Sequence, residues 1–245
     1  YGTFLNPFVH VAPAINAAGN GGCVILFPGE YVSGIGITSA LPRQVRVQSY
    51  DSAANGGRLS ASTPDSIFWV NNTHKAIAGI AIEGNNPVID GLVFRSANPL
   101  QPGGLNVQFV RPVAVTVYDA SLNPGAAIQN SVFTGFRGKP PVIIGDNAEN
   151  VRVQGSTFSS NDSRGGAALT ISSSTGILVQ RNTFTGNNST DLGADISEPV
   201  VQVTDSVASL YNNRFVANGA RSVLRVRNTG DPLGELSLIH ISEPT

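Results

Sequence analysis

The chain of 245 residues carries 15 lysine and arginine residues against 16 aspartate and glutamate residues, so its net charge is -1. This balance argues against a nucleic-acid partner, because binding to phosphates requires a basic surface that displaces counterions. A single cysteine excludes an internal disulfide framework and a cysteine metal cluster.

The surface is expected to be polar but weakly charged, since charged residues make up only 13% of the chain. Such surfaces are common in secreted proteins that contact neutral or mildly acidic polymers, so the composition favours a secreted or cell-surface location. No apolar stretch approaches the ~20 residues that a membrane span requires, and no membrane span is expected.

A short helix is predicted over 12–18, with Pro13 near its start and Gly19 directly after its end. Such a helix would cover the exposed first repeat of a sheet structure, whose open end invites aggregation. We therefore interpret residues 1–22 as an N-terminal cap segment. The apolar run Cys23–Phe27 that follows is predicted to be a strand, with Cys23 buried as a small hydrophobic residue.

An internal repeat dominates the rest of the chain. Five windows of ten residues align without gaps: IDGLVFRSAN, IQNSVFTGFR, VQGSTFSSND, VQRNTFTGNN and LYNNRFVANG. The sixth position of every window is a phenylalanine, at Phe94, Phe133, Phe158, Phe184 and Phe215. Their spacings of 39, 25, 26 and 31 residues indicate a period of about 25, with loops inserted in two repeats.

Each position in the window predicts a place in the structure. The aliphatic first position and the phenylalanine are expected to point inward. The third position holds glycine or asparagine except at Arg181, which is typical of a left-handed residue at a tight corner. Asn161, Asn187 and Asn218 occupy the ninth position, where amides of neighbouring repeats can hydrogen-bond to one another.

A second β-rich run lies between the windows, as in Val201–Thr204 and Leu224–Arg227, where apolar and polar residues alternate. Two or three short strands per repeat cannot bury their apolar faces alone, whereas stacked repeats bury them in one column. We therefore predict an all-β fold, a right-handed parallel β-helix (solenoid) over 23–229 with a short N-terminal capping helix. An antiparallel sandwich also has many short strands, but it would not place phenylalanine in one column at this period.

The end of the chain does not follow the repeat. We interpret 230–245 as a non-repeat tail, and its last ten residues, 236–245, resemble the in-frame translation of a transposase-type sequencing adapter. These residues are expected to be artefactual, and the natural chain is expected to continue past Glu235 into further repeats. The chain starts at Tyr1 and contains no Met, which indicates a processed product or a fragment.

Two motifs carry a resemblance to a known family. The opening, with AINAA at 14–18 and VILFPGEY at 24–31, resembles the start of the pectin-lyase-like superfamily of right-handed parallel β-helices, and the IDGLVF repeat is similar to those of its polysaccharide lyases and surface proteins. The resemblance covers most of 12–229 and implies this fold. It leaves the activity open, because the superfamily includes lyases, hydrolases, epimerases, esterases, tailspikes and non-catalytic adhesins.

The catalytic motifs of three branches of that superfamily are absent. The sequence contains neither the Asp-Asp pair and Gly-His-Gly of polygalacturonases, nor the Asp-Pro-His-Asp of mannuronan epimerases, nor the Gly-x-Val-Asp-Phe of pectin esterases. A β-eliminating lyase needs less, namely a group that neutralises the substrate carboxylate and a base, which in the resembling families is often Arg or Lys. The candidates for that chemistry are Asp90, Arg95, Arg137 and Lys139, beside the insertion 98–112, although all four also fit solvated surface charges.

An outward-facing row is the predicted carbohydrate-binding surface. The second position of the windows holds Asp90, Gln129, Gln154, Gln180 and Tyr211. Amides spaced by one repeat would offer donors and acceptors to sugar hydroxyls, and a tyrosine can stack on a sugar face. The alternative is a structural ladder in which the glutamines hydrogen-bond to one another.

A second row, predicted to follow the other strand, contains Asp119, Asp146, Ser173, Asp205 and Asn228. Carboxylates one repeat apart, such as Asp119 and Asp146, would repel unless a cation such as Ca²⁺ bridged them. Asp, Ser and Asn are also ordinary turn residues, so turn chemistry is the alternative. The insertion 187–198 adds Asp191, Asp195 and Glu198, at spacings that match no known calcium loop.

Three functions follow from these features. The first is an extracellular β-helix that contacts polysaccharide or a cell-surface glycan along one face, without a complete catalytic set. The second is a polysaccharide lyase acting on uronate polymers. The third is a non-catalytic surface adhesin or stalk segment whose repeat serves only the architecture.

Overall fold

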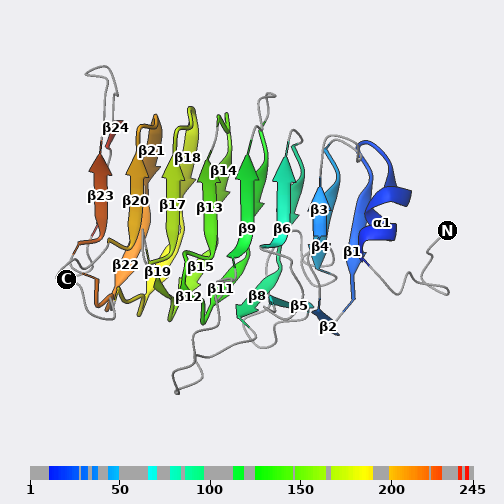
Figure 1. Ribbon diagram of the computed structural model, residues 1–245, viewed down its shortest axis with the longest axis horizontal. Coiled ribbons are helices and arrows are strands. Elements are labelled where there is room, and N and C mark those ends of the chain that lie inside the picture. The colour runs from blue at the N-terminus through cyan, green and yellow to red at the C-terminus, as the bar shows by residue number, and fades with distance from the viewer. Residues whose placement is uncertain are drawn as a thin grey trace, which may run out of the picture.

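The computed structural model describes residues 11–27, 29–32, 35–37, 44–49, 66–70, 78–83, 86–96, 113–118, 125–145, 147–163, 167–189, 199–220, 222–227, 237–238 and 241–242. These residues form a mostly β structure with one short helix (Figure 1). Every strand pairing between them is parallel, which excludes the antiparallel sandwich for this part of the chain.

Three long sheets and one short sheet account for all the described strands. The first sheet contains β1 (Cys23–Leu26), β4 (Arg46–Ser49), β7 (Val88–Asp90), β10 (Ala127–Gln129), β14 (Arg152–Gln154), β18 (Ile177–Gln180), β21 (Ala208–Tyr211) and β24 (Ser237–Leu238). The second contains β2 (Gly29–Val32), β5 (Ser66–Val70), β8 (Val93–Ser96), β11 (Val132–Thr134), β15 (Thr157–Ser159), β19 (Thr183–Thr185), β22 (Asn213–Val216) and β25 (Ile241–Ser242). The third contains β3 (Ile35–Ile37), β6 (Ala78–Glu83), β9 (Val113–Tyr118), β13 (Val142–Gly145), β17 (Leu169–Ser172), β20 (Val201–Thr204) and β23 (Leu224–Arg227). The short sheet pairs β12 (Arg137–Gly138) with β16 (Asp162–Ser163).

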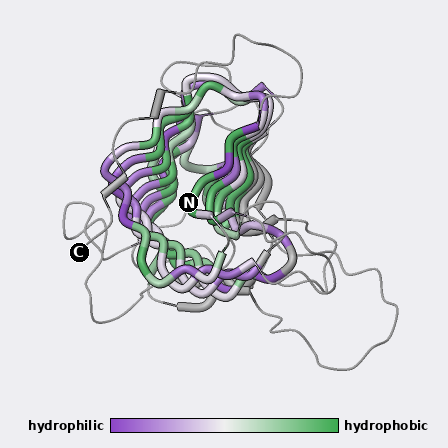
Figure 2. Tube along the Cα trace, turned by 90° about the vertical axis from the view of Figure 1, so that its left-hand side faces the viewer, coloured by the Kyte–Doolittle hydropathy of each residue, from purple (hydrophilic) through white to green (hydrophobic). Residues whose placement is uncertain are grey.

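Consecutive strands go to the first, second and third sheets in turn, so each strand pairs with its counterpart from the neighbouring repeat. Viewed along the long axis, the described repeats lie one behind another, and bands of similar hydropathy run from repeat to repeat (Figure 2). The sequence repeat is therefore the structural repeat.

The five phenylalanines of the repeat form one buried column, as predicted. Strand pairing places Phe94, Phe133, Phe158, Phe184 and Phe215 in direct register. Ring centroids of neighbours are 4.8 to 5.1 Å apart and the rings are within 16° of parallel. This distance equals the spacing of strands in a sheet, about 4.8 Å, so the backbone pairing itself sets the ring stacking. Backbone pairing also aligns Phe68 with Phe94, and Tyr31 with Phe68, at two positions outside the five aligned windows.

The corners of the repeat confirm the reading of its third position. Gly91, Asn130, Gly155, Arg181 and Asn212 all have φ between 49° and 67°. Arg181, the exception in residue type, has the same left-handed backbone with φ 55°. The fold therefore imposes the left-handed conformation at this corner. A residue with a Cβ can occupy it, with a conformational free-energy cost of order 1 kcal/mol.

Two internal ladders of polar side chains run along the stack. In the predicted ladder, Asn161 Nδ2 donates to Asn187 Oδ1 (2.9 Å) and Asn187 Nδ2 donates to Asn218 Oδ1 (3.0 Å). The other lies at the fourth window position, where the N–H of Ser156 donates to Asn182 Oδ1 (2.9 Å). The repeat pattern did not predict this second ladder. Both satisfy backbone groups at corners, where the sheet pairing is interrupted.

The predicted N-terminal helix is present as α1 (Val11–Ala18). It contacts β1 and β3, the first strands of two sheets, and buries Val11 and Ile15 against the hydrophobic core. Figure 1 shows it at the N-terminal end of the stack. Gly19 ends the helix with φ 72°, a conformation that glycine adopts without steric cost.

The tail adds two short strands to the sheets. β24 pairs with β21, and β25 pairs with β22. Such pairing uses backbone N–H and C=O groups, which any sequence can supply. This pairing therefore does not test whether 236–245 is artefactual. That origin, and the domain boundaries at residues 22 and 229, stay predictions.

Truncation of a central ring tests the column. Phe158 is fully buried between the rings of Phe133 and Phe184, so we expect Phe158→Ala to reduce the free energy of unfolding by about 3–5 kcal/mol. Ser159→Ala, on the outward face of the same strand, should change it by less than about 0.5 kcal/mol. Chemical denaturation measures both variants, and equal effects would contradict the column.

Candidate functional site

The predicted outward row lies on the first sheet, with one residue from each of five neighbouring strands. Strand pairing aligns Asp90 with Gln129, Gln129 with Gln154, Gln154 with Gln180, and Gln180 with Tyr211. The residues on either side of each member in its strand point to the opposite face, because side chains alternate along a strand. The first position of the window accordingly fills the core, with Ile128 and Val153 fully buried.

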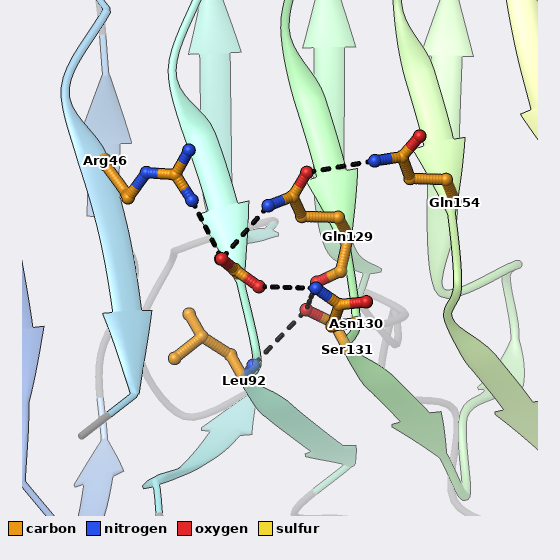
Figure 3. Close-up of polar contacts among 7 residues, drawn as sticks. Arg46, Leu92, Gln129, Asn130, Ser131 and Gln154 are labelled. Carbon is orange, nitrogen blue, oxygen red and sulfur yellow. Dashed lines mark hydrogen bonds and ion pairs between the residues drawn. The ribbon is translucent and has the colours of Figure 1, made fainter. Parts of the chain in front are cut away.

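The glutamines of this row form a ladder, of which Figure 3 shows the part that contains Gln129 and Gln154. Gln129 Nε2 donates to Asp90 Oδ2 (3.0 Å), Gln154 Nε2 donates to Gln129 Oε1 (3.2 Å), and Gln180 Nε2 donates to Gln154 Oε1 (2.8 Å). All three glutamines remain half-buried. An amide can donate twice and accept twice, so these bonds leave each glutamine with capacity for a further partner at the surface.

Asp90 is buried although it stands in an outward row. The residue is only 2% exposed. Its carboxylate accepts hydrogen bonds from Arg46 Nη1 (2.8 Å), Gln129 Nε2 (3.0 Å) and Asn130 Nδ2 (3.0 Å). The contact with Arg46, whose side chain is 41% exposed, is also an ion pair. The interpretation of Asp90 as a solvated surface charge is therefore wrong. The carboxylate can be buried because three protein donors replace the water that it loses.

The carboxylate fixes the direction of the whole ladder. A carboxylate only accepts hydrogen bonds, so Gln129 must turn its amide nitrogen toward Asp90 and its oxygen toward Gln154. Gln154 and Gln180 adopt the same orientation, since each directs its amide nitrogen toward the oxygen of the preceding glutamine. Gln180 Oε1 is the last acceptor of the row, and no described residue donates to it. It lies beside Tyr211, the half-buried aromatic residue in the next position of the row.

The four candidates for lyase chemistry come from three different sheets and from the turn after β12. Asp90 lies on β7 of the first sheet and Arg95 on β8 of the second, where Arg95 is aligned with Thr134. Arg137 and Lys139 are exposed, at and after β12, where Arg137 is aligned with Asp162. The ion pair of Asp90 is with Arg46, which the sequence analysis did not single out. The insertion 98–112 lies outside the described residues.

The second predicted row is only partly covered. Asp119, Asp146 and Asn228, with Asp191, Asp195 and Glu198 of the later insertion, lie outside the described residues. Ser173 and Asp205 have φ of 46° and 48°, which supports their role in turns. Among the described residues, no three His, Cys, Asp or Glu side chains are grouped so that they could hold a metal ion.

Cys23 is exposed, which corrects the prediction of a buried residue. Strand β1 buries Val24 and Leu26 instead, so the alternation along the strand places Cys23 on the outer face. Cys23 is aligned with Arg46 on β4. Partial burial of the thiol raises its pKa; the nearby Arg46 lowers it in part, and Asp90 raises it further.

Comparison with known proteins identifies no relative by sequence. No family model matches the chain, and no curated protein matches it. Among solved structures, one match is the crystal structure of a "putative glycosyl hydrolase" from Parabacteroides merdae ATCC 43184. It is 11% identical, covers 92% of this chain and 88% of that chain, and has a TM-score of 0.28. A likeness this weak carries no argument about function.

Within the described residues, no helix has the length and apolar character needed to cross a membrane.

Removal of the Asp90 carboxylate tests its role as the anchor of the ladder. We expect Asp90→Ala to lower the free energy of unfolding by about 1–3 kcal/mol, because Gln129, Asn130 and Arg46 lose their acceptor. Thr134→Ala, on the outward face of the second sheet, should stay within about 0.5 kcal/mol of the unchanged protein. Urea denaturation measures both, and an Asp90→Ala protein as stable as the control would remove the anchor.

The thiol of Cys23 provides a test that depends on pH. In the folded protein, iodoacetamide should alkylate Cys23, since the residue is exposed. Because the pKa of the folded thiol is raised, the thiolate forms at higher pH than in the unfolded chain. The alkylation rate should therefore rise at a higher pH in native buffer than in guanidinium chloride, and a midpoint equal or lower in native buffer would contradict the shift.

Proposed function

We propose that this chain is a right-handed parallel β-helix of the pectin-lyase-like superfamily, located outside the cell or on its surface. We further propose that it binds a polysaccharide or cell-surface glycan on the outer face of the first sheet. The cyclic order of strands among three parallel sheets and the register of the repeat support the fold. The half-buried side chains of the row from Gln129 to Tyr211 support the binding surface, with the buried Asp90 as their anchor.

The observation that carries the glycan proposal is the free end of the amide row. Gln180 Oε1 has no donor among the described residues and lies beside Tyr211. A sugar ring offers hydroxyl donors to such an oxygen and an apolar face to an aromatic side chain. Gln154 and Gln129 continue the polar surface at intervals of about 4.8 Å, one strand at a time.

The architectural alternative also has support. The glutamines hydrogen-bond to one another, as a purely structural ladder requires. On this view the row stabilises the stack and contacts no ligand. The lyase alternative is less favoured by the geometry, because the buried Asp90 carboxylate is already bound to three donors and cannot approach a substrate.

Glycan binding by two variants at the end of the row separates these alternatives. On an array of polysaccharides, the unchanged protein should bind at least one glycan, and both Tyr211→Ala and Gln180→Ala should weaken that binding about tenfold, as expected for the loss of one stacking or hydrogen-bonding partner. Gln202→Ala, a half-buried glutamine on the third sheet, is the matched control and should bind normally. Absence of binding to every glycan, with normal folding by circular dichroism, would favour the architectural role.

A further inference from the structure

Two arginines lie beside the free end of the amide row. Arg181 directly follows Gln180 and occupies the corner between β18 and β19. Its backbone N–H donates to the carbonyl of Tyr211 in the next repeat (3.3 Å). Arg214 lies on β22 and is aligned with Thr183, two residues after Arg181. The register therefore places the two Cα atoms about 8 Å apart, close to Tyr211.

Both guanidinium groups are available for a ligand. Arg181 and Arg214 are exposed, and in the part of the chain that the structure describes neither side chain forms an ion pair or a hydrogen bond. The four surrounding strands, β18, β19, β21 and β22, have the sequences ILVQ, TFT, ASLY and NRFV, without an acidic residue. The positive charge of this corner is therefore not neutralised by its own strands.

The position of Arg181 gives a second reason to consider a ligand. The same corner holds glycine or asparagine in the other four repeats, residue types that adopt positive φ readily. Arginine here accepts a backbone conformation that disfavours it. Within the described residues, no hydrogen bond or ion pair of the Arg181 side chain compensates for this cost.

We infer that Arg181, Arg214 and Tyr211, with Gln180, form a binding site for an anionic substituent of a glycan, either a sulfate ester or a carboxylate. This inference rests on the proposed glycan-binding function and specifies the class of glycan. Each guanidinium presents a planar set of N–H donors that matches the oxygens of such groups. Tyr211 provides a ring for the sugar that bears the charge, and Gln180 Oε1 accepts from one of its hydroxyls.

Matched pairs of polymers test the inference. Dextran sulfate is compared with dextran, and polygalacturonate with its methyl ester, so that only the charge differs within each pair. We expect the unchanged protein to bind at least one charged polymer at least tenfold more tightly than its neutral partner, with an affinity that falls as salt is added.

Two single substitutions remove the charges. Arg181→Asn keeps a residue that tolerates the corner, and Arg214→Gln keeps a polar side chain on the strand. Each should reduce the affinity for the charged polymer about tenfold while leaving that for the neutral partner unchanged. Arg227→Gln, at an exposed arginine on the third sheet, is the control and should bind like the unchanged protein.

The outcomes separate this inference from the proposed function. If the protein binds dextran or another neutral glycan and the arginine substitutions change nothing, the anion site is wrong and the glycan surface stands. If Arg227→Gln weakens binding as much as Arg181→Asn, the attraction is a general effect of charge and the site is wrong. If no polymer of either kind binds, the proposed function itself fails. Which charged polymer loses affinity identifies the sulfate or the carboxylate as the ligand.

Discussion

The structure depends on one constraint, that each residue lies directly over its counterpart in the neighbouring repeat at the spacing of paired strands. This spacing, about 4.8 Å, suits flat rings and planar amides, which can stack or hydrogen-bond at that distance without any change of backbone. The phenylalanine column, the two internal ladders and the outer glutamine row all use it. Aromatic pairs in globular cores often prefer tilted arrangements, so the near-parallel rings here reflect the backbone more than the rings themselves.

The outer row differs from the internal ladders in having a charge at one end. Internal asparagines donate to backbone carbonyls as well as to one another, which holds each amide in place independently. Within the described residues, the side chains of the outer glutamines have no such backbone partners, and their order depends on Asp90. The carboxylate, itself neutralised by Arg46, thus organises a surface that extends over three further strands.

The repeat could be predicted from the sequence because its markers are local. Three residues of each window determine which side chains face inward: the phenylalanine, the aliphatic residue five positions earlier and the corner residue between them. The structure confirms the burial of the first two and the left-handed backbone of the third. The second ladder was not predicted because its position holds leucine in one repeat, serine in two and asparagine in two, so no single residue type repeats throughout. The burial of Asp90 could not be foreseen, since it depends on Arg46, 44 residues away and in a segment outside the aligned windows. Cys23 was assigned to the core from its apolar neighbours, whereas the phase of alternation along β1 places it outside.

The amide orientation that Asp90 imposes on the glutamines allows the row to lengthen by duplication of a repeat. Duplication of the unit between Gln154 and Gln180 would insert another glutamine that accepts from one neighbour and donates to the other, without disturbing either end. The row would lengthen by one strand spacing, and its terminal oxygen would move the same distance from the carboxylate. Repeated duplication would thus extend the polar surface in equal steps. A single inverted amide would lose its hydrogen bond toward Asp90 unless every glutamine between it and the carboxylate inverted too.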